Sequence, residues 1–217
     1  MTSEKLEREA IQALRRSYGE VGLPEFSKDP FELFHAWLKA AVETPVIVEA
    51  NAMVLSTVDG NQPSSRTVLL KDLTDRFSFF TNYNSRKAGE MAKNPKVSLL
   101  FPWYAMERQV IVLGSAKKIS AEASHEYFQS RPWGSQIGAW SSEQSADLDT
   151  REDLEIRFKE FAEKYPEGTL VPTPPHWGGF EVVPTSIEFW QGRYSRLHDR
   201  VRYTATPEGW NVKRVNP

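Results

Sequence analysis

The sequence contains no cysteine among its 217 residues. Disulfide bonds, thiolate metal sites, iron–sulfur clusters and a cysteine nucleophile are therefore excluded. The four histidines are scattered and lack the close pairing of common zinc sites, which disfavours a metal. No apolar run is long enough to span a bilayer, and the N-terminal residues have no apolar signal core. We therefore expect a soluble, cytoplasmic protein without a membrane partner.

The sequence also lacks an excess of charge of either sign, because it has 27 basic and 29 acidic residues and a formal net charge of −2. Such a balance gives no bulk attraction to nucleic acid, so an anionic ligand must be held by a local cluster of Arg and Lys. The glycine-rich dinucleotide fingerprint, the Walker A sequence and the nucleophile elbow do not occur. These absences disfavour three large enzyme classes.

The periodicity of apolar residues predicts several helices around a set of short strands. Hydrophobic residues make up 40% of the chain, which is enough for one core. Asp29 and Pro30 are typical of a helix start, and so is Thr150 with Asp153. We expect helices at 4–18, from Pro30 to about Pro45, and at 85–94, 121–130 and 149–164, and strands at 52–58, 65–71, 76–82, 96–102, 108–119, 179–190 and within 201–215.

Tight turns join most of these strands, as at 59–63, and residues 132–148 read as a polar loop. Five to seven short strands framed by helices argue for a mainly β fold, an antiparallel β-barrel with peripheral helices, and against alternating βαβ units. We expect a single domain, 1–217, in which the N-terminal segment 1–20 can be mobile.

Two basic clusters could hold an anion. Arg66 and Lys71 bracket an apolar strand and could bind a phosphate or a flavin, but spacing alone favours the simpler explanation that they are the charged ends of a half-buried strand. Arg86 and Lys87 follow Ser85, where a helix is expected to begin. Cations are unfavourable in a first helical turn, and a bound phosphate would remove that conflict. A solvated basic turn is an even alternative.

Two further groups have polar side chains at suggestive spacing. Gln109 enters an apolar strand and could bond a polar ring edge, but the residues alone favour a strand-edge role. Tyr127 and Arg131 share one helix face, with Ser135 shortly after, and the three suit a phosphate monoester. Helix capping by Arg131 is the simpler explanation on spacing alone.

The last cluster follows an aromatic pair. Trp190 leads into Arg196, His198, Asp199 and Arg200, a density of chemically capable groups that is unusual for a plain loop. An ion-paired surface loop remains the alternative.

These clusters occur in the order found in the pyridoxine/pyridoxamine 5′-phosphate oxidase family, which the sequence resembles over nearly its whole length. The stretches that carry the resemblance are RTVLLK (66–71), NSRKA (84–88), VSLLFPW (97–103), ERQV (107–110), SRPWGSQIGAWSSEQS (130–145), WGGF (177–180) and EFWQGRYSRLHDR (188–200). Together they make a specific match.

The resemblance implies a split β-barrel that binds FMN at a homodimer interface. It implies FMN contacts at Arg66, Thr67, Val68, Leu69, Leu70, Lys71, Phe80, Thr81, Arg86, Lys87, Gln109, Gln144, Ser145, Trp190 and Arg200. It places the substrate phosphate at Lys71, Tyr127, Arg131 and Ser135, and the pyridine ring near Arg196, Leu197 and His198. The segment Arg15, Arg16, Ser17 and Tyr18 resembles one that closes over the site.

The implied reaction is the oxidation of pyridoxamine 5′-phosphate and pyridoxine 5′-phosphate by dioxygen to pyridoxal 5′-phosphate, with release of hydrogen peroxide and, from the amine, ammonia. Arg196 and His198 are the residues implied at the reacting ring. Another flavin enzyme on the same barrel and a non-catalytic flavin or pyridoxal-phosphate carrier are the alternatives. Strand parity raises one conflict, since Arg66 and Lys71 are five apart and a regular strand directs them to opposite faces.

Overall fold

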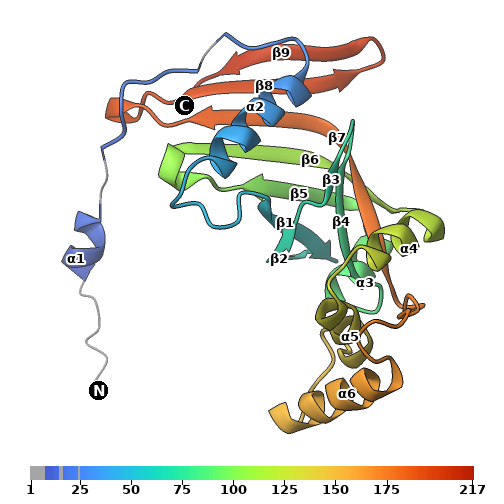
Figure 1. Ribbon diagram of the computed structural model, residues 1–217. Coiled ribbons are helices and arrows are strands. Elements are labelled where there is room, and N and C mark those ends of the chain that lie inside the picture. Colours follow the sequence, from blue (N-terminus) through green and yellow to red (C-terminus); the bar gives the residue numbers. More distant parts are fainter. Residues whose placement is uncertain (1–7, 15–16, 24) are drawn as a thin grey trace.

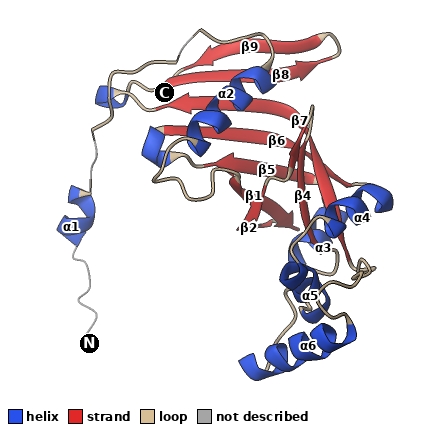
Figure 2. Ribbon diagram, in the orientation of Figure 1, coloured by secondary structure: helices blue, strands red, loops and turns tan. Residues whose placement is uncertain are grey.

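The computed structural model describes residues 8–14, 17–23 and 25–217, and contains one nine-stranded sheet flanked by helices (Figures 1 and 2). Every strand pair is antiparallel. The strands are β1 Ala52–Asp59, β2 Gln62–Leu69, β3 Asp72–Leu73, β4 Phe77–Asn82, β5 Lys96–Phe101, β6 Arg108–Lys118, β7 Trp177–Gln191, β8 Asp199–Thr206 and β9 Gly209–Val215.

The helices are mostly short and lie at the ends and on one face of the sheet (Figure 2). They are α1 Arg8–Ala13, α2 Pro30–Val42, α3 Arg86–Lys93, α4 Ala121–Gln129, α5 Trp133–Ser141 and α6 Arg151–Lys164, with single 3₁₀ turns η1 Tyr104–Met106 and η2 Tyr194–Arg196. None of the helices in the described part of the chain is long and apolar enough to cross a membrane.

Strand β7 organises the sheet because it pairs with three other strands. One edge pairs with β6 over almost its full length of 15 residues. The other edge pairs first with β4, over Trp177–Val182, and then with β8, over Ser186–Gln191. The sheet therefore divides along β7, with β4 and β3 on one branch and β8 and β9 on the other (Figure 1).

The division coincides with an irregularity in β6. The register between β6 and β7 shifts between Leu113 and Gly114. A Cβ atom on Gly114 would lie 2.4 Å from the carbonyl oxygen of Val183, so the two backbones approach too closely there for any side chain. Glycine in a strand commonly marks such a bulge or close approach.

The main core lies between α2 and the sheet. The ring of Phe34 on α2 is 5.1 Å from that of Phe77 and 4.9 Å from that of Phe101, and all three side chains are fully buried. As the sequence predicts, Asp29 caps α2 by accepting the N–H of Phe31, and Pro30 is its first residue. Burial of such rings supplies most of the stabilisation of a core of this kind.

A smaller core joins α4, α5 and α6 to the start of β7. Its buried side chains are Phe128, Ile137, Val171 and Trp177, with the rings of Phe128 and Trp177 5.0 Å apart. The predicted capping box of α6 is confirmed, since Thr150 and Asp153 each bond the backbone N–H of the other.

The antiparallel β architecture with peripheral helices agrees with the sequence-based expectation, but three details were wrong. The helix expected at 4–18 is described as α1, which ends at Ala13 and not at Tyr18, and whose exposed Ile11 packs in no described core, so its packing stabilisation is small; residues 4–7, 15 and 16 of that expectation lie outside the described residues. The expected loop 132–148 contains α5, despite two glycines and no capping side chain, because Gln136 and Ile137 are buried against its neighbours. The sheet has nine strands where five to seven were expected.

Gly114→Ala should lower the free energy of unfolding by about 1–3 kcal/mol, because the new methyl group must displace backbone at the bulge. Gly89→Ala is the matched control. An added Cβ there meets nothing within 4 Å, and alanine should stabilise α3 by about 0.5–1 kcal/mol. Urea unfolding of both variants measures the difference. Equal stability of the Gly114 variant and the native chain would contradict this account of the bulge.

Candidate functional site

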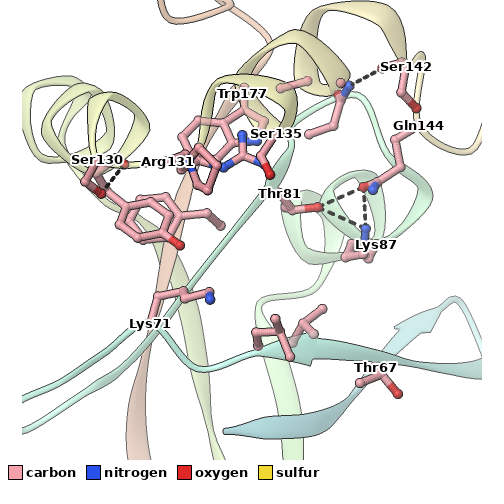
Figure 3. A pocket seen from close by; sticks show the side chains of 18 residues that line it. Thr67, Lys71, Thr81, Lys87, Ser130, Arg131, Ser135, Ser142, Gln144 and Trp177 are labelled. Atoms are coloured by element: carbon pink, nitrogen blue, oxygen red, sulfur yellow. Dashed lines mark hydrogen bonds between the residues drawn. The ribbon is translucent and has the colours of Figure 1, made fainter. Parts of the chain in front are cut away.

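A cavity of about 630 Å³ opens between the ends of β2 and β4 and the helices α3, α4 and α5. Figure 3 shows Lys71, Lys87 and Arg131 reaching toward it from three sides. Its lining residues are Thr67, Val68, Leu69, Lys71, Phe80, Thr81, Asn82, Lys87, Tyr127, Ser130, Arg131, Pro132, Ser135, Gly138, Ala139, Ser142, Gln144 and Trp177.

The buried ammonium of Lys87 forms the polar floor of the cavity. It donates to Gln144 Oε1 at 2.6 Å and to Thr81 Oγ1 at 3.0 Å (Figure 3), and also to Ser85 Oγ at 3.3 Å. Burial and the neighbouring charge of Arg66 lower the pKa of Lys87 to about 8, against the opposing charge of Glu90. An anion placed beside Lys87 would favour its charged form.

Helix α3 begins beside this lysine and has no acidic residue in its first turn. Ser85 is its N-cap but forms no side-chain cap, and Arg86 and Lys87 follow directly. The positive end of the helix dipole and two cations thus coincide, an arrangement that an anion stabilises. The sequence-based expectation of a helix start at Ser85 is therefore confirmed.

Arg131 approaches the cavity from the end of α4. Its guanidinium lies over the ring of Trp177, 4.8 Å from the centroid, and its Nη1 atom is buried with no hydrogen-bond partner among the described residues. Burial lowers the pKa of Arg131. A buried donor without a partner costs about 1–3 kcal/mol, so this group suits an anionic ligand.

Aromatic rings form the wall next to Arg131. The rings of Tyr127 and Phe80 stack with centroids 3.9 Å apart, and Phe80 stacks on Trp177 at 5.4 Å. Such stacking restricts Tyr127, so its hydroxyl group has a defined position.

The position of Lys71 resolves the conflict over strand parity. Strand β2 ends at Leu69, two residues before Lys71. The N–H of Leu70 bonds the carbonyl of Asn51, and the N–H of Lys71 bonds that of Ser78, so the chain passes from pairing beside β1 to pairing beside β4. Side chains alternate between the two faces along β2, which contains Arg66, but Lys71 lies beyond the end of that strand and need not follow this alternation.

A second group of predicted residues surrounds the far end of β7. Gln109 pairs with Trp190 across β6 and β7, and Trp190 pairs with Arg200 across β7 and β8. The ring of His198 lies 4.6 Å from that of Trp190. Glu188 accepts two hydrogen bonds from Arg200, at 2.8 and 2.6 Å.

The turn that carries Arg196 has an unusual backbone. Ser195 and Arg196 have φ values of 52° and 63°, and each non-glycine residue in that region costs about 1–3 kcal/mol. His198 Nδ1 accepts the N–H of Arg193 at 3.1 Å, which places the proton of the neutral ring on Nε2. Burial and the charge of Arg196 lower the pKa of His198 and favour that neutral form.

The described part of the N-terminal segment packs against this second group. The ring of Tyr18 meets those of Trp190 and His198 edge-on, at 5.7 and 5.5 Å. Asp199 accepts the N–H of Leu23 at 3.1 Å and pairs with Arg193 at 3.2 Å. Ser17 is exposed beside Tyr18, whereas the predicted Arg15 and Arg16 lie outside the described residues.

The structure thus divides the predicted site residues between two places. Those that line the cavity are Thr67, Val68, Leu69, Lys71, Phe80, Thr81, Lys87, Tyr127, Arg131, Ser135 and Gln144. Arg86 and Ser145 line an adjoining hollow with Gln144. Those at or beside the far end of β7 are Tyr18, Gln109, Trp190, Arg196, Leu197, His198 and Arg200.

Two predicted cofactor residues have side chains engaged elsewhere. Leu70 is buried in the main core. Arg66 bonds the carbonyl of Leu55 at 3.3 Å and the carboxylate of Glu90 at 3.1 Å, and is not among the cavity lining.

Sequence reasoning assigned no role to Trp177 or Glu90. Trp177 stands in the quoted WGGF stretch, and its ring forms part of the cavity wall. Glu90 is four residues after Arg86 on one helix, a spacing that could have suggested their ion pair at 2.8 Å.

Two family models match the chain. Residues 38–165 match the model described as pyridoxamine 5′-phosphate oxidase, and residues 177–217 match the pyridoxine 5′-phosphate oxidase C-terminal dimerisation region. The chain is 47% identical over 213 residues to a pyridoxine/pyridoxamine 5′-phosphate oxidase of Streptomyces avermitilis, which covers 94% of this chain and 95% of that protein. It is 50% identical over 211 residues to the enzyme of that name from Burkholderia cenocepacia, with coverage of 94% and 97%.

Solved structures agree with the fold. PhzG from Burkholderia lata, in complex with tetrahydrophenazine-1-carboxylic acid, superposes with a TM-score of 0.84 at 26% identity, covering 92% of this chain and 99% of that one. A pyridoxamine 5′-phosphate oxidase-related, FMN-binding protein from Nostoc punctiforme has a TM-score of 0.70 at 16% identity, covering 88% and 100%, and shares the split-barrel fold. On the family models and the curated relatives together, the chain belongs to the pyridoxamine 5′-phosphate oxidase family and is an oxidoreductase of that family.

Proposed function

We propose that this protein is an FMN-dependent oxidase that converts pyridoxamine 5′-phosphate and pyridoxine 5′-phosphate to pyridoxal 5′-phosphate. The observation that carries the proposal is one cavity lined by two separate cations, the buried Lys87 and the half-buried Arg131, each suited to a phosphate. FMN would supply the two-electron chemistry, in which a hydride equivalent leaves C4′ of the substrate and dioxygen is reduced to hydrogen peroxide; the alcohol gives the aldehyde directly, whereas the amine gives an imine that water hydrolyses with release of ammonia.

The residues at the start of α3 fit the phosphate of FMN. Arg86, Lys87 and the first turn of α3 bring positive charge together with no acid in that turn. Thr81 and Gln144 hold Lys87 from the cavity side. The backbone and side chains of Thr67 to Leu69 would form the edge along which the flavin ring lies.

Arg131 is the best candidate for the phosphate of the substrate. Its Nη1 atom is one of four buried side-chain donors without a partner in the described chain, and Lys71, Tyr127 and Ser135 line the same cavity. A phosphate monoester would accept hydrogen bonds from all four side chains. The aromatic wall of Phe80 and Trp177 fixes Tyr127 and Arg131 before the ligand arrives.

A homodimer would complete the site. Trp177 at the cavity and Trp190 beside His198 stand near opposite ends of β7, and an extended strand of 15 residues spans roughly 45 Å at about 3.3 Å per residue. The two ends of β7 lie on different sides of the molecule (Figure 1), so one chain keeps its cavity and its second group apart. A two-fold axis could bring the second group of one protomer to the cavity of its partner. The match of residues 177–217 to a dimerisation region supports this arrangement.

Arg196 and His198 would then position the pyridine ring. His198 would donate from Nε2, because Nδ1 is occupied by the N–H of Arg193. The strained turn carries Arg196, whose side chain is exposed. Tyr18 packs on the same histidine and would limit the access of water.

Anaerobic mixing of the yellow holoenzyme with pyridoxamine 5′-phosphate tests the proposal. Bleaching of the flavin, followed by recovery in air with formation of pyridoxal 5′-phosphate, is expected. Absence of bleaching would refute the oxidase, and would leave the carrier as the alternative. Bleaching by a different donor only would favour another flavin enzyme on this barrel. The 47–50% identity to oxidases, against 26% to PhzG, supports the oxidase.

Arg131→Ala should raise KM for pyridoxamine 5′-phosphate by about one to two orders of magnitude, since one charge-assisted contact is lost. FMN should stay bound. Arg151→Ala, which removes an exposed cation on α6, is the control and should leave KM unchanged. An unchanged KM for the Arg131 variant would remove that residue from the phosphate site.

FMN affinity should fall as the pH rises through about 8. Lys87 is charged below its pKa of about 8 and neutral above it, so binding of an anion at higher pH must take up a proton. The Kd for FMN should therefore rise by up to about tenfold per pH unit above that value. Fluorescence titration between about pH 7 and about pH 9 measures it. Lys87→Met should bind more weakly with no such slope, and a slope kept by that variant would contradict the assignment.

Arg196→Ala should slow flavin reduction by about tenfold or more in single-turnover experiments while FMN remains bound, because the reacting ring loses a positioning contact. Lys213→Ala removes an exposed cation on β9 and serves as the control. A normal reduction rate would exclude Arg196 from the reaction.

A further inference from the structure

The carboxylate of Glu90 is the most connected buried acid that the proposed site leaves unexplained. Its side chain is 3% exposed. Oε1 accepts from Arg86 Nε at 2.8 Å and from Ser64 Oγ at 3.1 Å. Oε2 accepts from Ser64 Oγ at 2.8 Å, from Arg66 Nη2 at 3.1 Å and from Thr57 Oγ1. The network joins α3 to β1 and β2.

The ionised state of Glu90 is well supported by these partners. Burial by itself opposes ionisation, but the hydrogen bonds from Thr57, Ser64 and Arg86 and the charge of Arg66 lower the pKa of Glu90 to about 2. Glu90 is therefore an anion at neutral pH, set among three cations, Arg66, Arg86 and Lys87. The group retains a net charge of about +2, which matches a phosphate monoester of about −2.

Helix stability does not explain this arrangement. An ion pair at this spacing stabilises a helix better when the acid precedes the base, whereas Arg86 precedes Glu90 here. The desolvation of a buried carboxylate also costs more free energy than a surface ion pair contributes to stability. What the network achieves is geometric: one carboxylate fixes an arginine on β2 and an arginine in the first turn of α3.

We infer that Glu90 is a positioning residue for the flavin phosphate, which holds Arg66 and Arg86 in place through their bonds to its two oxygens. Glu90 engages Arg86 through Nε, so this bond does not consume the terminal nitrogens that give a guanidinium its fork for phosphate. Arg66 then acts through the network and through its charge near Lys87. The inference rests on the proposed function, because it assumes that FMN is the ligand.

Glu90→Gln distinguishes a positioning role from a simple effect of charge, because the two predict opposite changes in FMN affinity. The amide has the same shape but turns one acceptor into a donor that faces other donors, so the arginines lose their fixed geometry. Positioning predicts that the flavin-free full-length variant binds FMN about tenfold more weakly or worse, with riboflavin affinity changed less than about threefold. Removing a negative charge without a positional effect would instead tighten FMN binding.

Fluorescence titration with FMN and with riboflavin measures both affinities. Asp59→Asn is the matched control, since it removes a carboxylate that pairs with Lys93 on the same helix at 3.0 Å but does not touch Arg66 or Arg86. It should leave both affinities within about twofold. FMN binding by Glu90→Gln that is unchanged or tighter overturns the inference, and so does an equal loss for both ligands, which would indicate a structural role.

The FMN preference of the native chain distinguishes failure of the inference from failure of the proposed function. A native chain that does not prefer FMN over riboflavin contradicts the phosphate site and the inference together, whereas a native preference that Glu90→Gln retains contradicts the inference alone. If the Gln variant does not fold, Ser64→Ala removes one donor to Glu90. It should weaken FMN about threefold without affecting riboflavin, and no selective loss would overturn the inference.

Discussion

The pairing of one long strand with three neighbours is the constraint on which the molecule depends. β7 pairs with β6 along one edge, and with β4 and then β8 along the other. Its first half places Trp177 in the wall of the cavity, and its last residues place Trp190 beside His198. The same strand that builds both groups also keeps them apart, since a strand cannot shorten its rise per residue by much. Under the proposed function, a site shared between two protomers would bring the two groups together.

Charge balance is the second organising feature. The cavity is lined by the buried Lys87 and the half-buried Arg131, whose pKa values burial lowers, while the buried acid Glu90 already has two arginines as partners. Buried cations of this kind are expensive unless an anion joins them. Phosphate groups would remove that cost, and the aromatic wall and the network around Glu90 keep the donors in place for them.

Local signals in the sequence predicted the parts of the structure that depend on neighbours in the chain. The caps at Asp29 and Thr150 and the helix start at Ser85 are examples, because a few adjacent residues decide each. Long-range packing decided the rest. The helix α5 forms in a glycine-containing segment because Ile137 is buried, and Lys71 reaches the cavity because the chain changes partner after β2. The family resemblance supplied the site residues, but it did not indicate Glu90, whose role depends on contacts across three elements.

The most direct test of the shared site is complementation between two impaired chains. Arg131→Ala lacks a cavity residue and Arg196→Ala lacks a residue of the second group, so a mixed dimer would contain one intact site and one doubly altered site. Unfolding and refolding the two together should restore about a quarter of the native activity at limiting substrate, because half of the dimers are mixed. Activity no greater than the average of the two separate variants would show that each chain forms its site alone, and would contradict the account.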